Sequence, residues 1–158
     1  MRRLPSRACV VLVASIAGLM VASCGNGVTQ SAPLTTVNSS GVPCLQAVDE
    51  YKMITKAESQ LGNNSAMTPH LYATKVEVIA KASAWLADHA TGVSLNARRY
   101  WGSQSLSMSS EITKAANSGT ATDQLIQYSG TAQSAAFLHD GQRVVSFYIA
   151  ACPGFATG

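Results

Sequence analysis

The sequence predicts an all-α fold, a bundle of four or five helices. Between Cys44 and Cys152, apolar residues recur at steps of three and four, the period of a helix that buries one face. Short runs of glycine, asparagine, serine and proline interrupt this pattern, as helix ends require. The stretch contains no internal repeat and no linker-like segment that would divide it, so we expect residues 44–158 to form one helical domain.

Capping and turn residues delimit the first two predicted helices. The first runs from Cys44 to Leu61 and ends at Gly62-Asn63-Asn64. The second begins at Thr68-Pro69, because threonine can cap a helix and proline is tolerated at its first position. It carries a broad apolar face and is expected to stop at Gly92.

The third helix is predicted to start at a Ser94 cap and to end at Asn117-Ser118-Gly119. A fourth can start between Thr120 and Asp123. Its face is a stripe of mostly small residues that permits close helix packing. This stripe consists of Leu125, Ser129, Ala132 and Ala136, and it can extend to His139.

Two structures compete for residues 135–150. Asp140-Gly141 lies between two apolar runs, which is a hairpin signal by local rules. Nothing earlier in the chain offers another strand, and an isolated hairpin is marginal in water. We therefore favour a short final helix from about Gln142 to Cys152, ended by Pro153-Gly154, with the hairpin as the alternative.

A basic and apolar leader precedes the predicted domain. Residues 1–7 include three arginines, residues 8–22 are almost wholly apolar, and small residues precede the cysteine in Val21-Ala22-Ser23-Cys24. This order is typical of a secretory leader. The apolar run is about 15 residues and a membrane-spanning helix needs ~20, which favours cleavage over an uncleaved signal anchor.

The segment Val21-Ala22-Ser23-Cys24 resembles the lipobox of bacterial lipoproteins. In that family the cysteine thiol receives a diacylglyceryl group, and cleavage leaves the lipidated cysteine at the N-terminus. The resemblance implies a signal peptide over residues 1–23, lipidation at Cys24 and a lipid anchor on the extracytoplasmic face of the cell membrane. Residues 24–43 are polar and are predicted to form a flexible tether. The whole pattern resembles small all-helical surface lipoproteins of actinobacteria, whose function is unknown.

Cys44 and Cys152 remain after the leader and the lipidated cysteine are set aside. Because an exported protein meets an oxidising environment, we expect them to form a disulfide that joins the first helix to the last. Two buried free thiols are the alternative. A metal site is disfavoured, since the two cysteines lack the C-x-x-C spacing and nearby histidines of zinc sites.

The formal net charge of +3 comes from the leader. Without its three arginines, the chain has eight basic residues against eight acidic ones. Nucleic-acid binding requires a basic excess, so we do not expect nucleic acid as a partner.

The chain carries no recognisable catalytic or metal-binding motif. It lacks G-x-S-x-G, S-x-x-K, H-E-x-x-H and a phosphate loop. Tyrosine and histidine can ligate haem, but tyrosines at helical spacing are more often core residues. We therefore expect a non-enzymatic protein without a cofactor or metal.

Arg98-Arg99-Tyr100 is the most unusual polar cluster, because it puts two cations near a predicted helix N-terminus, where the helix dipole disfavours positive charge. One interpretation pairs an arginine with Asp88 or Glu111 and buries Trp101. The other turns Arg98, Arg99 and Tyr100 outward as a partner-binding patch.

Taken together, these features favour a lipid-anchored module that binds a protein or envelope component at the cell surface. The alternative is a carrier of a small apolar ligand. In that case alanine- and serine-rich helices leave a cavity, whose expected lining is Trp85, Trp101, Met108 and Phe147.

Overall fold

A computed structural model describes residues 41–63 and 67–156. Within these ranges the fold is all-α, as predicted, with five helices and no strand. The helices are α2 (Cys44–Asn63), α3 (Pro69–His89), α4 (Leu95–Asn117), α5 (Thr122–Ala132) and α6 (Ala135–Ala151). The leader, Cys24 and most of the predicted tether lie outside the described residues, so the expectations about them stay predictions.

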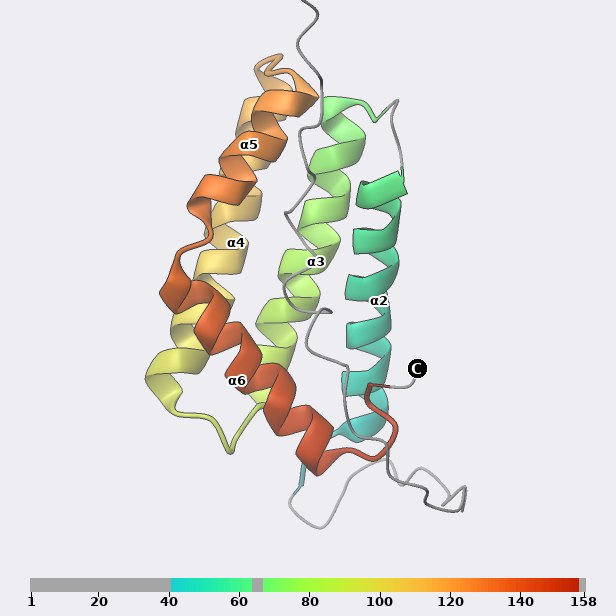
Figure 1. The fold of residues 1–158 in the computed structure, drawn as a ribbon, viewed down its shortest axis with the longest axis vertical. Coiled ribbons are helices and arrows are strands. Elements are labelled where there is room, and N and C mark those ends of the chain that lie inside the picture. Colours follow the sequence, from blue (N-terminus) through green and yellow to red (C-terminus); the bar gives the residue numbers. More distant parts are fainter. Residues whose placement is uncertain (1–40, 64–66, 157–158) are drawn as a thin grey trace, which may run out of the picture.

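Three long helices, α2, α3 and α4, run side by side with α3 in the middle (Figure 1). The C-terminal pair covers one face of this layer. α5 lies along one end of α4, and α6 crosses the other end of the layer to reach the start of α2. None of the described helices is long and apolar enough to cross a lipid bilayer.

Glycine permits the close packing of α4 on α3. A Cβ atom at Gly102 would lie 3.2 Å from the Ala87 Cβ and 3.6 Å from the Ala84 Cα. Small residues at such a crossing let two helices approach closely.

The helix starts agree with the sequence in part. Thr68 caps α3, because its hydroxyl accepts a hydrogen bond from the Leu71 backbone N–H at 3.3 Å. Ser94 is the N-cap residue of α4, as predicted, but its side chain makes no capping hydrogen bond. Ser134, which the sequence analysis did not single out, caps α6 by accepting from the Phe137 backbone N–H at 3.1 Å.

The C-terminal segment corrects two predictions. Residues 135–150 are helical, and α6 runs through Asp140-Gly141 instead of starting near Gln142. The predicted fourth helix was too long, because α5 ends at Ala132 and Ala136 and His139 belong to α6.

Gly141 lies inside α6 because the Trp101 indole occupies the space beside it. A Cβ atom at this position would lie 2.7 Å from Trp101 Nε1, which is closer than real Cβ contacts allow. The glycine that resembles a turn signal is therefore a packing residue.

The larger part of the core lies where the disulfide closes the fold. Cys44 and Cys152 are bonded, with their Cα atoms 5.3 Å apart, and they join the start of α2 to the end of α6 as predicted. Beyond the disulfide, Phe155 stacks on Tyr148 at a centroid distance of 5.2 Å. Val42, within the range predicted as tether, is 1% exposed and belongs to this core.

A smaller core occupies the opposite end of the bundle and consists of Tyr72, Ala73, Val76, Ile112, Ala116 and Leu125. Met108 of α4 packs against both cores. The hydrophobic interior is therefore divided along the bundle axis, and the region around Met108 joins the two parts.

Candidate functional site

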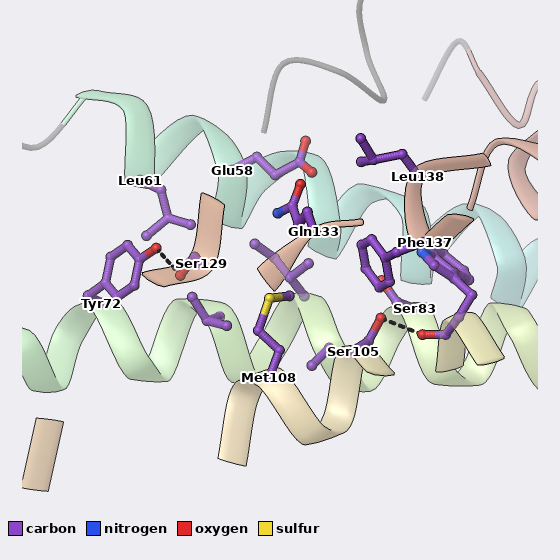
Figure 2. Close-up of a pocket in the computed structure, with 14 residues that line it drawn as sticks. Glu58, Leu61, Tyr72, Ser83, Ser105, Met108, Ser129, Gln133, Phe137 and Leu138 are labelled. Carbon is purple, nitrogen blue, oxygen red and sulfur yellow. Dashed lines mark hydrogen bonds between the residues drawn. The ribbon is translucent and has the colours of Figure 1, made fainter. Parts of the chain in front are cut away.

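An apolar cavity lies between the two cores (Figure 2). Every described helix contributes to its wall. The lining residues are Glu58, Leu61, Tyr72, Val76, Ile79, Ala80, Ser83, Trp101, Ser105, Met108, Ser129, Gln133, Phe137 and Leu138. Its volume is about 60 Å³. A single water needs ~10–15 Å³ and a cavity of ~150 Å³ holds benzene, so this space is larger than one water and too small for a benzene ring.

Small side chains create this space. Ala80 and Ser83 of α3, Ser105 of α4 and Ser129 of α5 are buried and line the cavity. Interiors are otherwise packed to near-crystalline density, so a layer of alanine and serine among larger residues leaves unfilled volume. The alanine- and serine-rich composition of the helices thus has a direct structural consequence.

Most polar groups deep in the cavity are satisfied within the protein. Ser105 Oγ donates to the Trp101 carbonyl at 2.9 Å, and Ser129 Oγ donates to the Leu125 carbonyl at 2.9 Å. Because the Ser129 hydroxyl hydrogen is already used, the Tyr72 hydroxyl donates to Ser129 Oγ, at 2.7 Å. These bonds leave the deep wall predominantly apolar.

The cavity opens between α2 and the link from α5 to α6. Glu58, Leu61, Gln133 and Leu138 are only partly buried, whereas the lining residues farther in are mostly buried. Figure 2 shows Glu58 and Gln133 on the same side of the cavity, across from Met108. Little direct contact joins α2 to α5 in the described part of the chain, which leaves this side less covered.

Glu58 is the charged residue of the site. Burial raises the pKa of its carboxyl group to about 7. None of the ion pairs between described residues includes Glu58. An acid with a strongly raised pKa at the edge of an apolar cavity is a candidate binding group.

Sequence reasoning missed Glu58, although the sequence contains a signal for it. Tyr51, Ile54, Glu58 and Leu61 follow one another at steps of three, four and three along α2. This spacing places the acid on the buried stripe of the helix. Glu58 could therefore have been recognised from sequence as an acidic residue at a position where the helix pattern calls for an apolar one.

The cavity predicted from sequence is confirmed only in part of its lining. Trp101 and Met108 line it, whereas Trp85 and Phe147 do not. Trp85 stacks on His89 with ring centroids 4.1 Å apart. Phe147 lies against Gly92 and Tyr148 instead.

Arg98 and Tyr100 of the predicted patch each make a hydrogen bond within the chain. Arg98 Nη1 donates to the Asp88 backbone carbonyl at 2.7 Å, and the Tyr100 and Ser134 hydroxyls are hydrogen-bonded at 3.1 Å. Trp101 is buried in the core, as the structural interpretation required, although Arg98 bonds the backbone of Asp88 instead of its carboxylate.

Both arginines nevertheless line a shallow surface groove between α3 and α4. Two exposed leucines, Leu95 and Leu106, lie in the same groove, and each exposes nearly half of its surface. The groove, which Asp88 also lines, therefore combines charged side chains of both signs with exposed apolar area.

Within residues 41–63 and 67–156, no three histidine, cysteine, aspartate or glutamate residues gather as a metal site would require. Comparisons with protein-family models, with curated proteins and with solved structures found no match for this chain.

Proposed function

We propose that this protein is a lipid-anchored binding protein on the extracytoplasmic face of the cell membrane, and that it carries a small apolar ligand without catalysing a reaction. The observation that supports the proposal is the cavity between the two cores. Its deep wall is mostly apolar, and the polar side chains of Glu58 and Gln133 lie at one opening, which is the usual form of a small-ligand site.

The cavity supports a carrier better than the arginine cluster supports a protein-binding module. Arg98 and Tyr100 already have partners within the chain, so they contribute less to an outward-facing surface. The cavity, in contrast, is unfilled and mostly apolar space between the two hydrophobic cores.

The test is binding of 1-hexanol, a narrow apolar probe, measured by calorimetry. We use the full chain in phosphatidylcholine nanodiscs, with empty discs as the blank. Ala80→Leu places a larger side chain in the cavity and should abolish saturable binding, because Ala80 is buried in the cavity wall. Ala150→Leu makes the same change at an exposed position and should leave binding unchanged. Hexanol that binds equally to both variants would exclude the cavity as the site.

The lipid anchor has its own test. Intact-mass analysis of the native protein should show loss of residues 1–23 and an added diacylglyceryl group on Cys24. Cys24→Ser should release the protein from the membrane fraction. A native protein with an unprocessed start and no acyl mass would contradict the anchor without affecting the cavity.

The groove between α3 and α4 supports a second candidate function, binding of a protein or envelope component. Exposed leucines beside two arginines combine apolar and charged contact area. Cross-linking on intact cells should capture a neighbour that is lost in Arg99→Ala/Leu106→Ser. Lys52→Ala/Met53→Ser alters one exposed cation and one exposed apolar residue on α2 and should leave that neighbour in place.

A further inference from the structure

The chemistry of the cavity opening specifies the kind of ligand that the proposed carrier would hold. Inside the cavity, the Tyr72, Ser105 and Ser129 hydroxyls donate to atoms of the protein itself. Trp101 Nε1 is buried without a hydrogen bond, but it lies against Gly141 of α6. A ligand group placed there gains few polar contacts, so apolar contact dominates. The part of the ligand that enters the cavity is therefore a hydrocarbon.

At the opening the situation is different, because Glu58 forms no ion pair with any residue of the described ranges. Among the described residues that line the cavity, Glu58 is the only acidic or basic side chain apart from the Tyr72 phenol. The nearby titratable group on its own helix is Tyr51, which adds no positive charge, and the wall residues from α4, α5 and α6 are neutral. The opening thus presents a single carboxyl group, with the Gln133 side chain on the same side.

A partly buried carboxylate favours a positively charged hydrogen-bond donor. Such charge-assisted bonds are shorter and stronger than bonds between neutral groups. A second carboxylate or a phosphate would instead meet like charge in a poorly solvated place. The electrostatics of the opening therefore select against anionic head groups.

We infer that the cavity binds a single-chain amphiphile whose protonated amine pairs with the Glu58 carboxylate while its alkyl chain enters the apolar cavity between the two cores. The inference rests on the proposed carrier function. The cavity volume of about 60 Å³ is less than half that of a ~150 Å³ cavity that holds benzene, so it has room for only a few carbons of one alkyl chain, and the rest of the chain would extend through the opening.

The test compares three probes of equal chain length, hexylamine, 1-hexanol and hexanoate, with the full chain in nanodiscs. At about pH 8 the Glu58 carboxyl is mostly ionised, and a primary amine, like a lysine side chain, is protonated. We expect hexylamine to bind about tenfold more tightly than hexanol and hexanoate to bind most weakly, as charge-assisted pairing predicts. At about pH 5, where Glu58 is protonated, the amine should lose this advantage while hexanol binding stays constant.

Two variants test whether Glu58 causes the preference for hexylamine over 1-hexanol. Glu58→Gln should bring the affinities of hexylamine and hexanol close together without loss of hexanol binding. Glu50→Gln makes the same change on α2 outside the cavity wall and should leave the amine preference intact.

The outcomes separate the inference from the function on which it rests. If hexanol binds as tightly as hexylamine, or hexanoate binds best, the amine assignment is wrong and the carrier function stands. If no probe binds the unaltered protein, both fall. Because the ranking of probes on the unaltered chain decides the inference, it stays testable even if a variant does not fold.

Discussion

Glu58 opposes folding stability at the place where we propose that it binds a ligand. The carboxyl occupies a position on the buried stripe of α2, between Ile54 and Leu61. Burial without a cationic partner disfavours its ionised form and raises its pKa to about 7. An apolar residue or an amide at this position would avoid that cost.

This cost predicts a pH-dependent gain in stability for Glu58→Gln. Because the folded-state pKa lies above the ordinary value of 4.5, the folded protein binds the proton more tightly than the unfolded chain does. The contribution of Glu58 to stability is therefore fully present below about pH 4.5 and is lost as the pH rises through 7. We expect the glutamine variant to unfold like the parent at about pH 4 and to be more stable by about 1–3 kcal/mol at about pH 8.

Urea denaturation at both pH values measures this difference. Glu111→Gln makes the same change at an exposed position of α4 and should produce no comparable gain at high pH. An equal gain for Glu58→Gln at both pH values would show that burial of the charged form is not its cause.

Gly141 is required by a contact between two helices. A Cβ atom there would lie 2.7 Å from Trp101 Nε1, and Trp101 is 1% exposed, so the indole has little room to move. We expect Gly141→Ala to destabilise the fold by about 1–3 kcal/mol, the usual cost of overpacking, despite the better helix propensity of alanine.

Thermal unfolding compares this variant with Gly62→Ala in α2. No atom lies within 4 Å of a Cβ at Gly62, so alanine should be neutral or slightly stabilising there. A Gly141→Ala variant as stable as the parent would mean that Trp101 can repack.

At the scale of helices, the break between α5 and α6 decides where the cavity opens. Gln133 lies in the extended link and lines the cavity, and Ser134 starts α6 directly after it. Ser134 also meets the Tyr100 hydroxyl of α4 at 3.1 Å. One serine therefore both caps α6 and fixes the link against α4.

Capping geometry predicts unequal effects for two serines. Ser134→Ala removes a hydrogen bond to the Phe137 backbone N–H and should cost about 1 kcal/mol, whereas Ser94→Ala, which removes no capping bond, should cost less. The free energy of unfolding in urea decides between them. Equal costs would contradict the assignment of Ser134 as the stronger cap.

The presence of the helices and several of their ends were predictable from sequence. The periodic spacing of apolar residues indicates a helix, and capping, proline and glycine residues indicate where it begins or ends. Thr68-Pro69 starts α3, and Gly119, with a φ of 86°, follows the end of α4. The boundary between α5 and α6 was not predictable, since Gln133-Ser134 contains neither glycine nor proline. Gly141 was misread as a turn because its cause, Trp101, lies 40 residues earlier in the chain.

The cavity was harder to predict than the helices. Its existence depends on small residues from α3, α4 and α5 meeting at one level of the bundle, which periodicity within single helices does not specify. Glu58, by contrast, carried a readable signal, because it interrupts an apolar stripe.

At the scale of the whole molecule, the hydrophobic interior consists of two cores with the cavity between them. The larger core contains the disulfide together with Tyr148 and Phe155, and the smaller one is built around Tyr72 and Ile112. The cavity lies between them, away from the Cys44–Cys152 bond, which is not part of its wall. The disulfide at one end of the bundle can therefore stabilise the fold without occupying the cavity.

This arrangement predicts that Cys44→Ser/Cys152→Ser loses stability but keeps the cavity. The bond closes a loop with a sequence separation of 108, and a loop of ~100 residues contributes up to ~4.7 kcal/mol by restricting the unfolded chain. We expect a loss of about 3–5 kcal/mol in urea denaturation, and a similar loss for the parent under reducing conditions. Below the unfolding transition, 1-hexanol should still bind as it binds the parent. Loss of binding in the folded variant would show that the disulfide holds the helices at the spacing on which the cavity depends.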